Sequence, residues 1–482
     1  MNNDEMISFD ESGSLLKVGG MYKDWFLEYA SYVILERAIP DLFDGLKPVQ
    51  RRILHSMNTL EDGRYNKVAN IVGTTMQFHP HGDASISDAI IQLGQKDLLI
   101  DMQGNWGNIY TGDKAAASRY IEARLSKFAL EVVFNSKTTK WQLSYDGRKK
   151  EPIHLPIKYP LLLAQGAEGI AVGLSTKILP HNFNELIDSS IKHLKGKKFK
   201  LYPDFQTRGF VDIKNYNDGN RGGRIKVRAK LEKLDENSIT IKEIPYGTTT
   251  VSLIESIIKA SEKGKIKLKR IEDNTSSNVE IIVYLISGSS VPKTIDALYA
   301  FSQCEVSISP LSCIISNNKP EFIGVSDILR TSTENTRELL KEELEIELDE
   351  LNNQWHNISL EKIFIENRVY RDIEDKTSWE SVLSTIEEGL KPYVKKLKKE
   401  VSLDDIKKLT EIPIKKISKF DLNKVNEKLK NININIDEVN NNLGHITDYA
   451  IKYFEYLKKE YGKERKRKGH QRSSPHNWWR PP

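Results

Sequence analysis

The C-terminal third of the chain carries an apolar repeat that constrains its fold more than any other feature. Apolar residues recur there at alternating intervals of three and four positions, which is the spacing of a coiled-coil seam. A helix of this length would span roughly 50 Å, which is too long for one compact core to cover. The repeat consists of Leu422, Val425, Leu429, Ile432, Ile436, Val439, Leu443, Ile446, Ala450, Tyr453 and Leu457.

An earlier stretch has similar spacing and offers this helix an antiparallel partner. Two long paired helices cannot close a compact core, so we expect an arm over residues 331–462 that holds parts of an assembly apart. A plain dimerising coiled coil is the alternative. The earlier stretch contains Leu340, Leu344, Leu348, Leu351, Trp355 and Ile358.

The composition lacks the marks of a membrane protein or a disulfide-rich protein. The chain has 482 residues, of which 39% are hydrophobic and 29% charged, and it contains no run of 18 apolar residues. Its acidic N-terminus has no apolar segment, which argues against a secretory signal, so we expect a cytoplasmic protein. Cys304 and Cys313 cannot build a disulfide framework and are expected to be buried thiols.

Short helices and turns dominate the N-terminal third. Residues 1–20 are polar and predict a flexible arm, after which a helical pattern begins. Pro40 and Gly45 end that pattern, and a new helix should begin at Pro48, because proline is tolerated in the first turn. Together with the strand-like segment LLIDMQGNWGNIY, these elements predict a winged-helix unit over residues 21–145.

Strand-like patterns take over in the middle of the chain. In residues 146–330, apolar and polar positions alternate in GGRIKVRAKLEKL, NSITIKEIPYG and NVEIIVYLIS, with helical segments such as VSLIESIIKASEKGK between them. Residues 463–482 lose all periodicity and carry the run KERKRK, which predicts a basic, disordered tail. The chain as a whole is therefore expected to be an α+β multidomain protein.

The segment AAASRY places the hydroxyl of Tyr120 directly beside the guanidinium of Arg119. This pairing suits phosphoryl transfer, because a phenol that attacks phosphorus needs fixed positive charge near the developing phosphorane. An Arg-Tyr pair that merely opens an amphipathic helix is the alternative.

Positive charge also gathers upstream of this pair. The net charge of +5 is only mildly basic, so its placement matters more than its total. Lys47, Arg51 and Arg52 would project from the start of one helix, and Arg37 lies just before it. Such a cluster suits contacts with backbone phosphates, and a solvated helical face is the alternative.

The sequence HPHGD brings two histidines and a carboxylate close together. A metal site is disfavoured, because Pro80 forces an extended or turn geometry. The helix expected after Gly82 would attract an anion at its N-terminus, so His79 and His81 are expected to contact phosphate or to assist proton transfer. The chain has no GxxxxGK[ST] loop, and we expect neither a metal site nor an ATP site in it.

Four blocks follow one another along the chain: YASYVILERAIPDLFDGLKPVQRRILHSM, HPHGDASISDAI, MQGNWGNIYTGD and AAASRY. They resemble the DNA breakage-reunion subunit of bacterial type IIA topoisomerases, and the topoisomerase IV form of it more than the gyrase form. The resemblance implies that Tyr120 attacks a DNA backbone phosphate and forms a transient 5′-phosphotyrosine link. Arg119 and His79 would assist at that phosphate, and reversal of the transfer would reseal the strand.

The same resemblance assigns the DNA-binding residues. It places Arg37, Lys47, Arg51 and His81 along the DNA channel. Ile170, in the segment GIAVG, would be a wedge that enters a base step and bends the DNA. The residues of that segment alone would instead predict a tight, buried strand.

Two positions after HPHGD bear on drug binding. Many relatives carry a serine immediately after the motif and an acidic residue four positions further on, and both anchor a water-metal bridge to quinolone drugs. Here Ala84 occupies the serine position and Asp88 matches the acid. The resemblance therefore implies a weak quinolone response.

The resemblance also implies an architecture and partners. Residues 146–330 would form an α/β tower, and the arm would be a long antiparallel coiled coil with a small helical C-gate, a dimer contact at about residues 363–415. An ATPase like the B subunit of topoisomerase IV would hold Mg²⁺ and ATP, within an A2B2 heterotetramer that contains a homodimer of this chain. The DNA-wrapping C-terminal domain of the family is absent from this sequence, which argues against gyrase-like supercoiling.

The leading hypothesis is therefore the breakage-reunion subunit of an ATP-dependent type II topoisomerase. It would relax or decatenate double-stranded DNA in the nucleoid during chromosome segregation. A noncatalytic DNA-architectural protein would explain the basic channel and the wedge, but not Tyr120 beside Arg119. A histidine-dependent nuclease would need neither the apolar repeat nor an exit gate.

Overall fold

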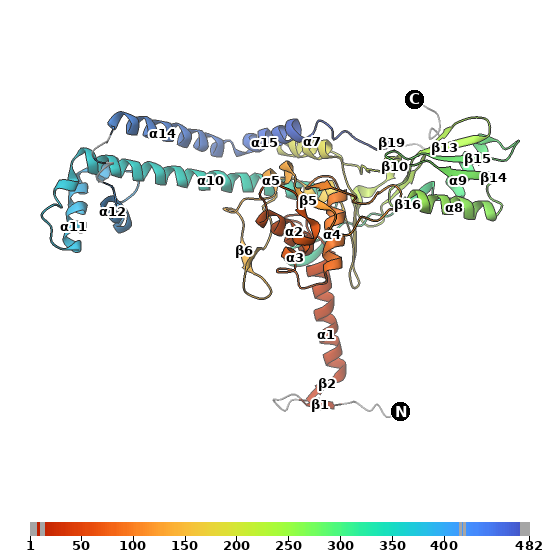
Figure 1. Cartoon of the computed structure of the whole chain (residues 1–482), viewed down its shortest axis with the longest axis horizontal. Coiled ribbons are helices and arrows are strands. Elements are labelled where there is room, and N and C mark those ends of the chain that lie inside the picture. Colours follow the sequence, from red (N-terminus) through yellow and green to blue (C-terminus); the bar gives the residue numbers. More distant parts are fainter. Residues whose placement is uncertain (1–6, 10–14, 414–416, 418–420, 473–482) are drawn as a thin grey trace. The chain divides into compact units, whose positions relative to one another are not determined.

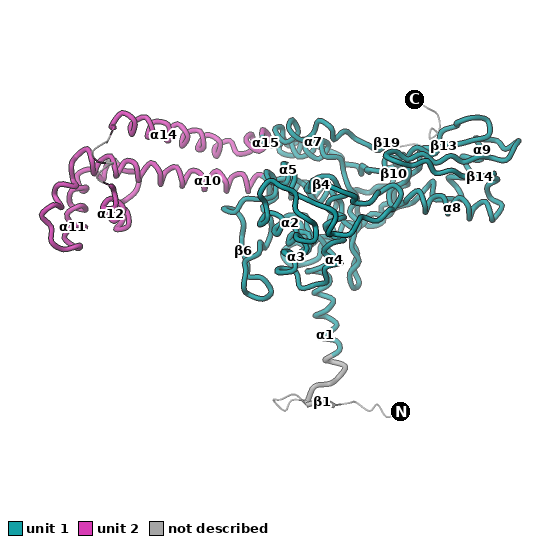
Figure 2. The backbone as a smooth tube through the Cα atoms, in the orientation of Figure 1, with its two compact units in different colours: residues 1–336, 453–482 teal, residues 337–452 magenta. Residues whose placement is uncertain are grey.

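The structure is a computed structural model that describes residues 7–9, 15–413, 417 and 421–472. Its chain divides into two compact units, residues 1–336 with 453–482 and residues 337–452 (Figure 2). The first unit combines helices with several small, mostly antiparallel sheets (Figure 1), which confirms the expected mixture of helices and strands. None of the helices over the described residues is long and apolar enough to cross a membrane.

Helices near the N-terminus pack around a small sheet of strand order β3-β5-β4. Pro48 lies in the first turn of α2, where its missing N–H leaves no helical hydrogen bond unmade, so the expected helix start is confirmed. Helices α2, α3 and α4 bury Ile53, Ile71 and Ile86 in one core. The elements are α1 Val18–Val33, the π-helical turn η1 Ile34–Ala38, α2 Pro48–Thr59, β3 Asn66–Lys67, α3 Val68–Thr75, α4 Asp83–Gln95, β4 Ile100–Gln103, β5 Glu122–Leu125 and α5 Lys127–Val132.

The flexible arm expected over residues 1–20 lies partly outside the described residues, namely at 1–6 and 10–14. The described part of this segment forms regular secondary structure. Strand β1 Ile7–Phe9 pairs antiparallel with β2 Leu15–Lys17, and α1 follows directly.

Two antiparallel hairpins and two helices connect this region to the strand-rich part of the chain. The first hairpin is β6–β7 and the second is β8–β9, with α6 between them and α7 after them. Their bounds are β6 Trp141–Leu143, β7 Lys150–Pro152, α6 Leu161–Gln165, β8 Ala167–Ile170, β9 Ser175–Ile178 and α7 Phe183–Leu194.

Two four-stranded sheets follow, with strand orders β16-β11-β10-β19 and β12-β13-β15-β14, where β19 is His470–Arg472 near the end of the chain. The second sheet packs on α8 and α9 through Ile239, Leu253 and Leu298, and Cys304 and Cys313 are buried free thiols, as expected. All three predicted strand segments and the predicted helix α8 are confirmed. The elements are β10 Phe210–Asn215, β11 Arg224–Arg228, β12 Lys230–Lys233, β13 Ser238–Glu243, α8 Thr250–Glu262, β14 Leu268–Asp273, β15 Ile281–Leu285, α9 Val291–Phe301, β16 Glu305–Ile308, β17 Cys313–Ser316 and β18 Lys319–Phe322.

The second unit is helical over its described residues. The long helix α10 leads into it, and α14 packs against α10 where Leu344 and Leu351 meet Ile436 and Val439. Helices α11 and α12 enclose a separate apolar cluster with the end of α10. The helices are α10 Val325–Glu366, α11 Trp379–Leu390, α12 Leu403–Thr410, α14 Leu422–Gly444 and α15 Ile446–Tyr461.

The expectation of one uninterrupted helix over residues 422–457 is wrong. Helix α14 ends at Gly444, and His445 has φ −126° and ψ 42°, which is not helical. Glycine is a poor helix former, and the His445 ring nitrogen Nδ1 lies 3.0 Å from the Asn441 carbonyl oxygen at this helix end. The apolar period continues across the break, so periodicity alone did not reveal it.

The expectation of a disordered tail over residues 463–482 is wrong for its first ten residues. We call residues 462–472 the C-terminal strap. It lies on the first unit and ends in β19 His470–Arg472, which pairs parallel with β10. Residues 473–482 lie outside the described residues.

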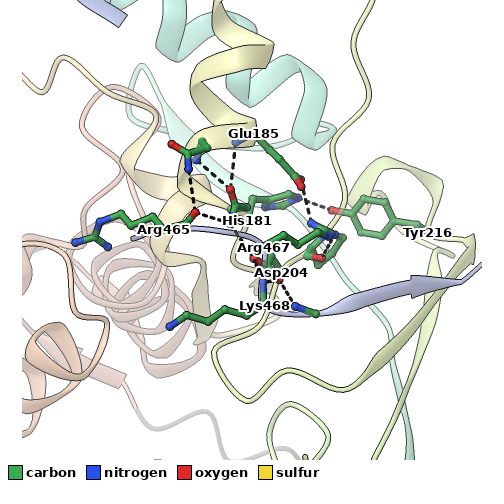
Figure 3. A network of polar contacts seen from close by, with 11 residues as sticks. His181, Glu185, Asp204, Tyr216, Arg465, Arg467 and Lys468 are labelled. Carbon is green, nitrogen blue, oxygen red and sulfur yellow. Dashed lines mark hydrogen bonds and ion pairs between the residues drawn. The ribbon is translucent and has the colours of Figure 1, made fainter. Parts of the chain in front are cut away.

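Carboxylates hold the strap in place (Figure 3). Asp204 accepts hydrogen bonds from the backbone N–H groups of Lys468 and Gly469, at 2.7 to 3.1 Å. Arg467 donates to Glu185 and to the Pro203 carbonyl, both at 2.9 Å. These acceptors explain why a basic run, expected to stay solvated, is ordered here.

Candidate functional site

Tyr120 lies in a turn formed by residues 118–120, immediately before β5. The Ser118 carbonyl accepts a hydrogen bond of 3.0 Å from the Ala69 N–H, and the Ile121 carbonyl accepts one of 3.0 Å from the Val68 N–H. These bonds fix the turn to the start of α3. The structure therefore rules out the alternative in which Arg119 and Tyr120 open a helix.

The tyrosine side chain is available to a ligand. Tyr120 is 63% exposed, and the Arg119 guanidinium carbon lies 4.6 Å from its ring centroid. The side chain thus offers a phenol to solvent with a positive charge over its ring. Among the described residues, no hydrogen bond or ion pair joins Tyr120 to the histidines of HPHGD.

The histidines instead line a hollow of about 460 Å³ beside the start of α4. Four residues singled out from the sequence meet there, and Asp88 lies exposed one turn further along α4. Glycine at position 82 precedes the first helical residue, Asp83, so the expected helix start is confirmed. The hollow is lined by Glu36, Arg37, Val49, His79, His81, Gly82, Ala84 and Ser85.

His79 is only 6% exposed, and its Nδ1 atom lies 3.1 Å from Nη1 of Arg52. Burial, followed by the positive charges of Arg52, His81 and Arg37, lowers the pKa of His79 to about 4. The imidazole is therefore neutral at neutral pH, and its ring lies nearly perpendicular to the His81 ring with centroids 4.5 Å apart.

Two further contacts complete the surroundings of the hollow. The Tyr32 hydroxyl, on α1, lies 2.5 Å from Nε2 of His81. Arg52 also donates to both carboxylate oxygens of Glu151, on β7, at 2.7 and 3.0 Å. Sequence reasoning missed Tyr32 and Glu151, because both approach from elements distant in the chain and no local motif marks them.

Arg51 does not match its expected role as a phosphate contact. Its Nε and Nη2 atoms donate to the two oxygens of buried Asp44, at 2.5 and 3.0 Å, and its side chain is only 12% exposed. Asp41 and Glu36 add further negative charge nearby. A guanidinium surrounded by carboxylates is a poor ligand for an incoming phosphate, so this pair is structural.

Lys47 is half-buried beside the β8–β9 hairpin. Its ammonium group donates to the Glu168 carbonyl at 2.5 Å, and burial lowers its pKa. A side chain at Gly169 would lie 2.0 Å from the Ala38 carbonyl oxygen, so only glycine lets the hairpin approach η1 this closely. Lys47 and Gly169 together fix the base of the hairpin.

The tip of this hairpin carries Ile170, which is 86% exposed. The tight, buried strand that its sequence alone predicted is therefore wrong for this side chain. Ala171 and Val172 follow it and pack against Ile39 and Cys313. A packed tip thus supports one exposed aliphatic side chain.

Among the described residues, one group has the spacing of metal ligands: Asp41, Asp44 and His154. Both oxygens of Asp44 already accept hydrogen bonds from Arg51, and the Leu46 and Leu155 N–H groups donate to them as well. A cation would have to displace a buried guanidinium, so this group does not fit a metal.

The sequence matches, over residues 37–455, the family model that describes the A subunit of DNA gyrase and topoisomerase IV. The chain therefore belongs to this family. It is 43% identical to the A subunit of DNA topoisomerase 4 from Borreliella burgdorferi over 92% of this chain and 71% of that protein. It is 29% identical to the A subunit of DNA gyrase from Brachyspira hyodysenteriae, over 92% of this chain and 56% of that one. With the corresponding gyrase protein of Leptospira biflexa, the identity is 33% over 73% of this chain and 45% of the relative.

Proposed function

We propose that this protein is the DNA breakage-reunion subunit of a type IIA topoisomerase, and that Tyr120 is its nucleophile. The exposed phenol of Tyr120 beside the Arg119 guanidinium carries this proposal. The phenol of Tyr120 loses its proton to solvent as its oxygen attacks a backbone phosphorus, a Tyr–O–P bond forms, and the bond from phosphorus to the 3′ oxygen breaks. The freed 3′ oxygen takes up a proton, and the reverse transfer reseals the strand.

The hollow at HPHGD would hold DNA backbone. Arg37 supplies positive charge there, His79 and His81 supply ring nitrogens, and Lys47 lies at the base of the neighbouring hairpin. Ile170 is exposed at the hairpin tip, as a wedge between base pairs must be. Mg²⁺ would be held by the partner protein, as the resemblance implies, and would neutralise phosphate charge. The group at Asp41 is not assigned to it, because Arg51 already occupies both oxygens of Asp44.

The long helices α10 and α14 would form the coiled-coil arm within residues 331–462, residues 146–330 the tower, and residues 21–145 the winged-helix domain. At the far end of the arm, Trp379 on α11 and Leu403 on α12 are each 56% exposed. Large apolar side chains exposed at one end suit a contact between two copies of this chain. This contact would be the C-gate of the homodimer.

Helix α1 offers a surface for the ATPase partner. It exposes aromatic and aliphatic side chains along its length. Contact of such side chains with water is unfavourable, so a partner that covers them would stabilise the helix. We assign this surface to a protein like the B subunit of topoisomerase IV, which would bring ATP and Mg²⁺ into an A2B2 assembly. The exposed side chains are Tyr22, Trp25, Phe26, Leu27 and Tyr29.

Denaturing electrophoresis of DNA after incubation with the chain, its partner and Mg²⁺ tests the proposal. We expect protein-linked DNA from the wild type and none from Tyr120→Phe, which removes the nucleophile and little packing. Arg119→Ala should slow cleavage about 100- to 1,000-fold, the cost of one fixed charge donor at a reacting centre.

Two other results would contradict the proposal. Free nicked ends without linked protein would indicate a nuclease. Intact DNA that is nevertheless bent would indicate a noncatalytic architectural protein, which is the second candidate function. The exposed side chain of Ile170 is also compatible with that function.

A further inference from the structure

Behind His79, three side chains from three separate elements form a connected row. Glu151 on β7 is 3% exposed and accepts two hydrogen bonds from Arg52 on α2, at 2.7 and 3.0 Å. The third arm of the Arg52 guanidinium, Nη1, reaches Nδ1 of His79 at 3.1 Å. Arg52 thus lies between the Glu151 carboxylate and the His79 imidazole, and connects the two through hydrogen bonds.

The guanidinium group makes this row rigid. It is planar, and its donors point in fixed directions, so a carboxylate that binds Nε and Nη2 also fixes the direction of Nη1. Gln142, on β6, lies 3.4 Å from the same carboxylate through its side-chain amide nitrogen. The β6–β7 hairpin therefore determines where the arginine meets His79.

The row also determines where the proton on His79 lies. Arginine has no acceptor, so Nδ1 of His79 must accept, and the single proton of the neutral ring is on Nε2. That atom lies on the opposite edge of the ring and has no hydrogen-bond partner among the described residues. His79 lines the hollow with Arg37 and His81, so the N–H group is free to meet a ligand there.

We propose that Glu151 is a positioning residue which, through Arg52, holds His79 as a neutral imidazole that donates its Nε2–H to a phosphate oxygen in the hollow. This inference rests on the proposed function and refines it: His79 stabilises charge on the phosphate and does not take the proton of Tyr120.

The charges around the ring agree with this role. Arg52 on α2, Arg37 on η1 and His81 face His79 with positive or potentially positive charge, while Glu151 lies behind Arg52. Burial and these neighbours lower the pKa of His79 to about 4. A base this weak removes a proton from a phenol poorly at neutral pH, whereas a neutral N–H donor needs no change of charge.

Nuclear magnetic resonance of the full chain, labelled with ¹⁵N-histidine, directly tests whether the row of Glu151, Arg52 and His79 holds the imidazole neutral. The chain has ten histidines, and the His79 signal is assigned by its loss in His79→Gln. We expect the wild-type ring to carry its proton on Nε2 and to stay neutral from pH 8 to about 5. A wild-type His79 that titrates near its usual pKa of about 6.5 would overturn the proposal.

In Glu151→Gln, the direction in which the pKa of His79 changes shows whether Glu151 positions Arg52. The new amide presents a donor to the donors of Arg52, so the arginine should leave, and the loss of its charge should raise the pKa of His79 by about one pH unit. If Arg52 stayed without the carboxylate, the pKa of His79 would fall, because only negative charge was removed. A fall or no change would show that Glu151 does not position Arg52.

A neighbouring ion pair provides the matched control. Asp44→Asn removes an equally buried bidentate partner from Arg51, one position along α2, and should leave the titration of His79 unchanged. Arg52→Lys is the second variant in case Glu151→Gln does not fold. It keeps the positive charge but cannot bind Glu151 and His79 at once, so the pKa of His79 should again rise.

Cleavage assays with Mg²⁺ and the partner protein complete the test. Glu151→Gln should form protein-linked DNA about 10- to 100-fold more slowly with unchanged DNA binding, the usual cost of losing an orienting residue. If the wild type formed no linked DNA, the proposed function would fail. The resonance data would still show whether Glu151, through Arg52, holds His79 neutral.

Discussion

Arg51 and Arg52 are neighbours in α2, and their side chains leave the helix about 100° apart. Each binds a buried carboxylate through two hydrogen bonds. The Arg51 pair ties α2 to the loop that holds Asp44, whereas the Arg52 pair continues to His79 and the hollow. One helical step therefore separates a structural ion pair from one that serves the site.

Two buried histidines should make the fold sensitive to acid. His181 is 4% exposed, its Nε2 lies 3.2 Å from the Tyr216 hydroxyl, and burial lowers its pKa to about 4, as for His79. The unfolded chain takes up protons near pH 6.5, before the native state does, so stability falls as the pH drops from about 6.5 to 4. Urea unfolding should show a loss of about 2 to 3 kcal/mol per histidine between pH 7 and 4.5.

His181→Gln removes one of these groups and provides the control. The variant should lose less stability than the wild type over the same pH interval, whatever its stability at pH 7. Equal losses in the two proteins would show that His181 does not stay neutral in the native state.

Position 84 should govern the response to quinolones. Ala84 and Asp88 are both exposed on α4, and alanine offers no hydrogen bond to a metal-bound water. A hydrogen bond is worth about 0.5 to 1.5 kcal/mol, or up to about 3 with a charged partner, so Ala84→Ser should strengthen drug-stabilised cleavage by about three-fold to a hundred-fold. Titration of cleavage complexes with drug measures this.

Ser85 is the matched control for this prediction. Its side chain leaves α4 about 100° around the helix from that of Ala84, so we do not expect it to replace the missing serine. Its hydroxyl donates to the Gly82 carbonyl at 2.7 Å. Ser85→Ala should leave the drug response unchanged, and an equal response in wild type and Ala84→Ser would contradict the assignment.

The position of the β8–β9 hairpin depends on the absence of a side chain at Gly169. Gly169→Ala would place a Cβ 2.0 Å from the Ala38 carbonyl oxygen, a backbone atom that cannot move cheaply. We expect destabilisation of about 1 to 3 kcal/mol and weaker DNA bending, because Ile170 is carried by this hairpin. Thermal unfolding and a fluorescence-transfer bending assay measure the two effects.

Gly73→Ala serves as the control, since α3 has open space at this position. Alanine is the better helix former, so this variant should be neutral or more stable by up to about 1 kcal/mol. Equal DNA bending and equal unfolding temperatures in the two variants would show that a side chain at position 169 does not strain the hairpin.

At the scale of elements, the sequence predicted what local periodicity and turn chemistry encode. The helix start at Pro48, the strands around Ile239 and Val283, and the helix after Gly82 are confirmed. The break at His445 was not predicted, because the apolar period runs through it. The pairing of Arg51 with Asp44 was not predicted, because no spacing rule identifies it.

At the scale of the whole molecule, the strap returns the chain to the unit in which it began. Asp204 receives backbone hydrogen bonds from Lys468 and Gly469, so its carboxylate is one of the attachments of the strap, beside the Arg467 contacts and the pairing of β19 with β10. Asp204→Ala should release residues 462–472, and limited proteolysis should then cut among their many lysines and arginines. Glu464→Ala, an exposed change within the strap, should leave the cleavage pattern as in the wild type.

The strap also sets an order of events during synthesis. The ribosome completes residues 1–336 long before residues 470–472, yet β10 gains its neighbour β19 only from the latter. The first unit must therefore wait, with one strand edge unpaired, while the whole helical insertion is translated. Nascent chains of this protein should consequently leave the edge of β10 open to pairing until residues 470–472 emerge and β19 takes over as the edge strand of the sheet.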